Sequence, residues 1–181
     1  MDDRTVLERV AAAFAHHPKP PDEALMNRHC CECLETSEAF GGARWQDVTL
    51  EQLLAGRETA LLTVEAWRYY LPAVIVWSVR DPKAVDVIAD NLVHQLTPPG
   101  EGGALAEWFE PRARGFTPDQ RAAIAAFLEW FAEREEAWWN EADATPPQGA
   151  RRALAYWSAP QPEAPAAPAR ARERGGHHPG Q

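Results

Sequence analysis

The sequence lacks the short motifs that identify the commonest enzyme classes. It contains no GxGxxG loop, no P-loop, no GxSxG turn and no HExxH helix. It therefore gives no sign of dinucleotide binding, phosphoryl transfer, serine hydrolysis or zinc proteolysis. No Ser or Cys stands at an informative spacing from a base that could activate it as a nucleophile. The sequence favours a protein that is not an enzyme.

Long hydrophobic runs and dispersed cysteines are also absent. The longest apolar run, residues 71–79, is too short to span a bilayer. The acidic start Met1-Asp2-Asp3 is followed by no apolar segment of a signal peptide. All three cysteines fall within residues 30–33. This clustering is not the pattern of a disulfide framework, and it fits a reducing compartment. We expect a cytoplasmic protein that does not enter membranes.

Basic residues are scarce: 18 Lys and Arg stand against 27 Asp and Glu, giving a formal net charge of −9. Sequence-independent nucleic-acid binding needs clustered basic side chains against phosphates, so this balance argues against it. It argues equally against docking on anionic lipid. An acidic surface attracts basic partners, so a protein partner of that kind stays open.

The chain is long enough for one domain. Its 181 residues are 45% hydrophobic and include eight Trp, which can supply much of a core. Residues 158–181 are rich in Pro, Ala, Arg and Gly and offer no large apolar side chain. This composition predicts a globular domain over 1–157 and a disordered tail over 158–181.

Helical patterns dominate residues 1–157, and no second alternating run exists to pair as a strand. We expect an all-α fold, a compact single-domain bundle of about six or seven helices. Capping, Gly and Pro signals place these helices. The expected helices are one ending before Pro18, 22–40, Thr49 to Gly56, one from Thr63 with a kink or restart at Pro72, Asp81 to Leu96, Thr117 to Ala144, and 148–157.

The sequence HCCEC, residues 29–33, is the stretch that most resembles a chemical site. On a helix, Met26, Cys30, Cys33, Ser37 and Phe40 share one stripe, which is typical of a core-facing seam. Free cysteine is among the most buried residue types, so packing is the favoured interpretation.

Two functional alternatives use the same cysteines. One zinc ion could be bound by His29, Cys30 and Cys33. A structural zinc site usually has four protein ligands, and no second CxxC or HxxxH motif supplies the fourth. A redox role for Cys30 and Cys33 would require the CxxC motif at a helix N-terminus after a strand, as in thioredoxin-like folds, whereas the preceding segment is predicted as helix.

Asp86, Asp90 and His94 are spaced four residues apart and share one helix face. That row resembles a set of metal ligands. The apolar residues of the same segment define the opposite, buried face, so we expect the row to be exposed to solvent.

The helix predicted over 118–144 carries the strongest candidates for partner binding. Its core face contains Ile124, Phe127, Leu128, Phe131 and Trp138, with Trp139 at the edge. Trp130 lies off that face, so it meets either a second helix or a binding partner. Arg134 neighbours it, and Trp and Arg are both enriched at interfaces. Trp130, Arg134 and Trp139 are therefore the predicted partner-binding residues.

Four ordered motifs resemble those of a family of small bacterial proteins of unknown function. They are HCCEC at 29–33, WQDV at 45–48, EAWRYYLPA at 65–73 and FTPDQ at 116–120. The resemblance covers roughly residues 29–131 and leaves Trp138, Trp139 and the tail outside. It implies a soluble bacterial protein and transfers no catalytic residue.

Two classes of function follow. The first is a non-enzymatic cytoplasmic protein that engages a protein partner through its acidic, Trp-bearing surface. Bacterial immunity and accessory proteins offer a compositional analogy. This class predicts a contiguous exposed patch around Trp130 and Trp139 and inert, buried cysteines. The second is a zinc-binding or thiol redox protein that uses His29, Cys30 and Cys33.

Overall fold

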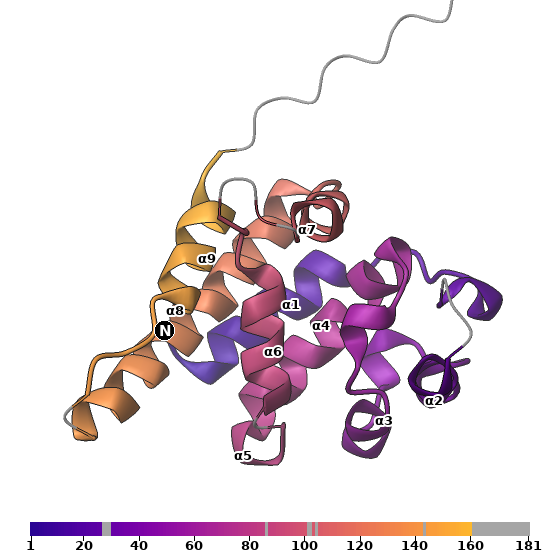
Figure 1. Cartoon of the computed structure of the whole chain (residues 1–181), viewed down its shortest axis with the longest axis horizontal. Helices are drawn as coiled ribbons and strands as arrows, with labels where there is room; N and C mark the ends of the chain where they lie inside the picture. The colour runs from indigo at the N-terminus through magenta and orange to yellow at the C-terminus, as the bar shows by residue number, and fades with distance from the viewer. Residues whose placement is uncertain (27–29, 86, 101–102, 104, 143, 161–181) are drawn as a thin grey trace, which may run out of the picture.

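The computed structural model (Figure 1) describes residues 1–26, 30–85, 87–100, 103, 105–142 and 144–160. Helices dominate these residues, and no strand longer than an isolated bridge occurs among them. Seven of their nine α-helices have seven or more residues, so the predicted all-α bundle is confirmed. The α-helices are α1 (Asp3–Phe14), α2 (Cys31–Phe40), α3 (Leu50–Ala55), α4 (Val64–Arg80), α5 (Pro82–Val85), α6 (Val87–Leu96), α7 (Ala106–Ala113), α8 (Pro118–Glu141) and α9 (Gly149–Ser158). Three short 3-10 helices lie between them: η1 (Asp22–Ala24), η2 (Trp45–Asp47) and η3 (Thr59–Leu61).

Local capping signals fix several helix starts where the sequence predicted them. At α3 the Thr49 hydroxyl accepts from the Gln52 backbone N–H, and the Gln52 side chain accepts from the Thr49 N–H. Thr117 and Gln120 repeat this pair at the start of α8. Such a capping box satisfies donors that a helix end leaves free, so both starts are readable from sequence.

The segment before α2 differs from the predicted helix over 22–40. Only η1 and α2 are helical there, and residues 27–29 lie outside the described residues. Met26 forms an isolated antiparallel bridge with Leu62. The backbone N–H of Thr63 donates to the Leu25 carbonyl at 2.9 Å, and the Thr63 hydroxyl donates to the Ala24 carbonyl at 2.8 Å. These contacts with distant residues replace the intrahelical bonds, so the long helix was a wrong prediction.

α4 lies at the centre of the fold and packs against α1, α6 and α7. Eleven of its seventeen residues are buried. Pro72 lies inside α4 and cannot donate a helical hydrogen bond, yet the helix continues from Val64 to Arg80 and the predicted restart does not occur. Burial of the surrounding apolar residues offsets that missing bond.

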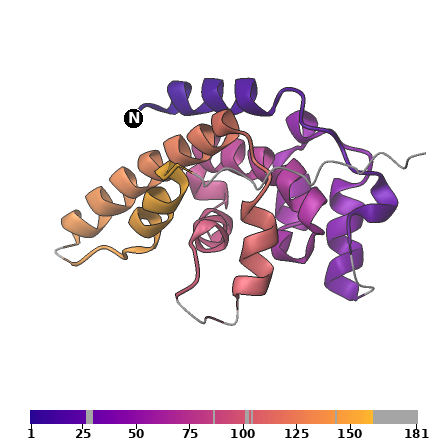
Figure 2. The ribbon, with the colours of Figure 1, turned by 90° about the horizontal axis from the view of Figure 1, so that it is seen from above.

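α8 is covered on two sides. α1 and α9 both pack on it, and Figure 2 shows α1 running beside α8. The core formed in this way is one cluster that extends from Val6 to Trp157. Most of the predicted tail, residues 161–181, lies outside the described residues.

α7 is a helix that the sequence did not indicate. Leu105 precedes it without a side-chain cap, and Pro111 lies inside it, so neither usual signal marks it. None of the helices in the described part of the chain is both long enough and apolar enough to cross a membrane.

Candidate functional site

A cleft of about 1710 Å³ crosses α6 and extends to α7, the end of α8 and the start of α9. Figure 1 shows α6 between the α8–α9 pair on one side and α2 and α3 on the other. Small-molecule pockets in proteins usually measure about 300–1000 Å³. The cleft is larger than that range. Its large apolar lining side chains include Leu105, Trp108, Phe131, Trp138 and Trp139.

Two of these lining residues are exposed to an unusual degree for apolar side chains. Trp138, near the end of α8, is 61% exposed, and Leu105, before α7, is 54% exposed. Trp138 contacts the half-buried Trp139 edge to face, with ring centroids 4.8 Å apart. The sequence placed Trp138 on the core face, and that prediction is wrong, because α8 continues beyond the contacts of α1 and α9, which reach Arg134 and Glu136.

Trp108 forms a fixed wall of the cleft. Its indole N–H donates to the Ala60 carbonyl at 3.2 Å. The buried guanidinium of Arg112 lies 4.1 Å from the Trp108 ring centroid and donates to the Leu62 and Trp108 carbonyls. Burial, followed by repulsion from Arg68, lowers the pKa of Arg112 to about 10. These contacts hold the indole in one orientation, so this wall is organised in advance of any ligand.

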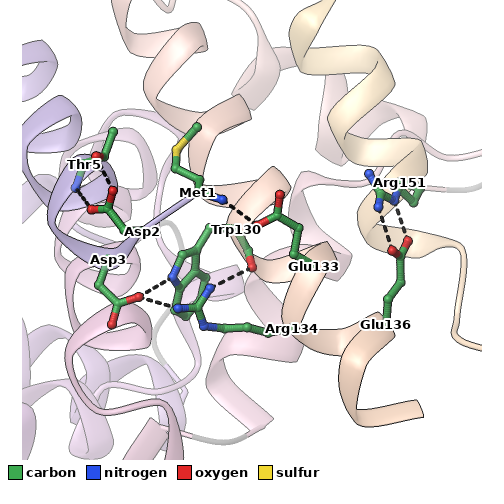
Figure 3. A network of polar contacts seen from close by, with 9 residues as sticks. All are labelled: Met1, Asp2, Asp3, Thr5, Trp130, Glu133, Arg134, Glu136 and Arg151. Atoms are coloured by element: carbon green, nitrogen blue, oxygen red, sulfur yellow. Dashed lines mark hydrogen bonds and ion pairs between the residues drawn. The ribbon is translucent and has the colours of Figure 1, made fainter. Parts of the chain in front are cut away.

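Trp130 is not part of an exposed patch. It is 2% exposed, and Figure 3 shows its indole N–H donating to the Asp3 carboxylate of α1, at 2.8 Å. Arg134 forms an ion pair with the same carboxylate and stacks on the Trp130 ring, 4.1 Å from its centroid. Of the two alternatives for Trp130, packing against a second helix is the one that the structure shows. Of the three predicted partner-binding residues, Trp139 and Arg134 line the cleft with a partly accessible side chain.

Carboxylates lie beside the cleft at the end of α8, and Arg134 and Arg152 line the same cleft. Glu135 lines the cleft, and burial, together with the nearby carboxylates of Asp90 and Glu136, raises its pKa. Glu136 itself forms a two-bond ion pair with Arg151 of α9, at 2.6 and 2.7 Å (Figure 3). Burial is the larger cause of the raised pKa of Glu135, and the repulsion from the Asp90 and Glu136 carboxylates adds to it.

The cysteines lie at the N-terminus of α2, where Cys33 also contributes to the lining of the cleft. Cys30 is the N-cap residue, and its sulfur accepts a hydrogen bond from the Cys33 backbone N–H at 3.2 Å. Cys30 and Cys33 form a disulfide, with Cα atoms 5.0 Å apart. Cys33 is 2% exposed and Cys30 is half-buried. Cys31 is exposed and its thiol donates to Glu32 at 3.1 Å. The sequence expected these cysteines within a helix, and that expectation is wrong for Cys30.

The proposed metal ligands are only partly described. His29 lies outside the described residues. Within the described residues, no group of three or more His, Cys, Asp or Glu side chains could hold a metal ion. Asp86 of the other candidate row also lies outside the described residues, and Asp90 and His94 are exposed, as predicted.

A family model matches residues 3–161 of the chain. The match is longer than the resemblance over 29–131 that the motifs indicated, and it includes α1, Trp138 and Trp139. Comparison with curated proteins and with solved structures finds no match. The helices, the cleft and the cysteine pair described above all fall within the matched residues. The chain therefore belongs to the family of unknown function DUF6714.

Proposed function

We propose that this protein is a non-enzymatic cytoplasmic protein that binds a segment of a protein partner in the cleft over α6, in an accessory or immunity-type role. The observation that carries the proposal is the exposed Trp138 in the lining of a cleft of about 1710 Å³. Apolar side chains exposed beside a large groove typically mark an interaction site. The volume suits a peptide segment better than a single metabolite.

The residues that line the cleft indicate the chemical character of the partner segment. Trp108, Trp138 and Leu105 offer apolar surface for inserted side chains. Glu135 and the nearby Asp90 carboxylate favour Lys or Arg on the same segment, and the net charge of −9 attracts a basic molecule from solution. The partner segment is therefore basic and amphipathic, an arrangement that a helix or an extended peptide can present to a groove.

A photo-reactive amino acid placed at position 138 in the full chain tests the location of binding. The expected result is a covalent adduct with one bacterial protein through a Lys- or Arg-rich segment, identified by mass spectrometry. Position 87 is the matched control, because Val87 is 59% exposed and lies on α6 without lining the cleft. An equal yield of the same adduct at both positions would contradict the proposal.

The synthetic segment identified by cross-linking then gives an affinity by calorimetry. Trp138→Ala should weaken binding by about tenfold or more, the usual effect of removing an anchoring Trp. Val87→Ala should leave the affinity unchanged. Glu135→Gln should weaken binding more at low salt than at high salt, since screening removes the contribution of the charge. A bound metabolite found by native mass spectrometry, with no peptide binding, would replace the protein partner with a small ligand.

A further inference from the structure

We propose that Cys30 and Cys33 are a redox-active pair that exchanges with the disulfide of another molecule, an activity separate from partner binding in the cleft. The two residues form a CxxC sequence at the start of α2, and they are bonded to each other in the structure. The structure therefore describes the pair in the oxidised of its two redox states. The substrate class is a disulfide, on a small thiol or on a protein.

The burial of the two residues assigns their roles. Cys30 is half-buried and precedes the helix, so its sulfur is the one that an outside disulfide can reach. Cys33 is 2% exposed and lies one helical turn further along, on the inner face of α2 with Thr36 and Phe40. Cys30 is therefore the attacking residue, and Cys33 is the residue that resolves the intermediate.

The start of a helix favours the thiolate form that attacks disulfides. The backbone N–H of Cys33 points at the Cys30 sulfur, 3.2 Å away, and a donor in this position stabilises a negative charge on sulfur. The partial positive charge at the N-terminus of the ten-residue α2 acts in the same direction.

A purely structural role explains the pair less well. A disulfide stabilises a fold chiefly by closing a long loop in the unfolded chain, and this one joins residues only three positions apart. Disulfides in the proposed cytoplasmic compartment are usually transient and belong to catalytic or redox-sensing proteins. Cys31 does not compete for the pair, because its thiol faces Glu32 on the exposed side.

The exchange proceeds in two balanced steps. The Cys30 thiolate attacks one sulfur of the substrate disulfide, a mixed disulfide between Cys30 and the substrate forms, the substrate S–S bond breaks, and the first substrate thiolate leaves and takes a proton from water. Cys33 then loses its proton to water, and its thiolate attacks the Cys30 sulfur. The Cys30–Cys33 bond forms, the mixed disulfide bond breaks, and the second substrate thiolate leaves and takes a proton from water. The protein dithiol loses two electrons and two protons, and one disulfide becomes two thiols.

The test uses the untagged full chain carrying Cys31→Ser, so that only the pair can react, with oxidised glutathione as the probe. The reduced protein should convert to the Cys30–Cys33 disulfide without retaining glutathione, as read by mass spectrometry after alkylation. Adding Cys33→Ala should trap one stable glutathione adduct on Cys30. Adding Cys30→Ser instead should give no adduct on the buried Cys33. Circular dichroism confirms that each variant is folded, and insulin in a parallel arm distinguishes a protein disulfide from a small one.

The asymmetry between the Cys33→Ala and Cys30→Ser proteins supports the proposal, as does a reaction at least about tenfold faster than that of a control chain whose only thiol is Cys31. Adducts of equal yield at both cysteines, or a dithiol that stays reduced in excess oxidised glutathione, would overturn it. About one zinc per chain in elemental analysis, with thiols that react only after chelation, would also overturn it. None of these outcomes depends on whether the cleft binds a partner.

Discussion

Replacing either of two tryptophans on α8, eight residues apart, by Ala should have very different effects on the free energy of unfolding. Trp130 is 2% exposed and Trp138 is 61% exposed. Trp130→Ala removes a buried indole, its stacking on Phe127 and the hydrogen bond to Asp3. Deleting a buried aromatic ring costs about 3–5 kcal/mol. Trp138→Ala removes a side chain that is mostly in water, and it should change the free energy of unfolding by no more than about 0.5 kcal/mol.

A smaller substitution separates the hydrogen bond of Trp130 from the rest of its contribution to stability. Trp130→Phe keeps an aromatic ring beside Phe127 and removes the indole N–H that donates to Asp3 at 2.8 Å. Hydrogen bonds to charged groups contribute about 1.5–3 kcal/mol. The exposed position of Asp3, whose side chain is 56% accessible, reduces that value, so about 1–2 kcal/mol is expected. The difference between the Ala and Phe variants then measures the apolar and cation–π part.

Urea unfolding followed by circular dichroism measures these changes. For a chain of this length the Trp130→Ala loss corresponds to a fall in Tm of about 6–20 °C. A cost below about 1 kcal/mol for Trp130→Ala would refute the arrangement of α1 on α8. A loss for Trp138→Ala as large as that for Trp130→Ala would show that the end of α8 is covered in solution.

Three further predictions test local features. Thr117→Ala breaks the capping box of α8 and should cost about 1 kcal/mol in urea unfolding, whereas Thr145→Ala, at an exposed site between α8 and α9, should cost nothing measurable. Burial, followed by the charge of Arg68, lowers the pKa of His17, so protonation favours the unfolded chain. The free energy of unfolding should fall as the pH drops below about 6.5. His17→Gln should flatten that slope. Burial raises the pKa of Tyr70, whose hydroxyl donates to the Phe40 carbonyl at 2.9 Å. Stability should therefore fall as the pH rises above about 10, while Tyr70→Phe should lose about 1 kcal/mol at pH 7 and show less of this alkaline loss.

The features that could be predicted from sequence are those fixed by neighbouring residues. Thr49 and Thr117 carry their capping partners three positions away, so the starts of α3 and α8 are readable without the fold. The segment before Cys30 is different, because Met26 pairs with Leu62 and Thr63 binds the carbonyls of Ala24 and Leu25. Those partners lie almost forty residues away, and no local pattern indicates them.

The candidate sites also depend partly on neighbouring residues, which the sequence reveals, and partly on distant ones, which it does not. A helical wheel gives the direction of Trp130 and Trp138, but it does not say where the covering helices begin and end. α1 covers Trp130, and Trp138 lies beyond that cover. The HCCEC motif was found from sequence, whereas its position at a helix start depended on the bridge that ends the preceding segment. The cleft over α6 had no sequence signal, because α7 supplies one of its walls and α7 itself was not predicted.

The burial of α4 on nearly every side has a consequence for how the chain unfolds. α1 and η2 pack on this helix from the first half of the chain, and α6 and α7 pack on it from the second half. Neither half can separate without exposing the same central helix to water, so opening one half removes part of the other half's core. The two halves therefore form a single cooperative unit, and the circular dichroism of the helices and the fluorescence of the tryptophans should report one coincident transition.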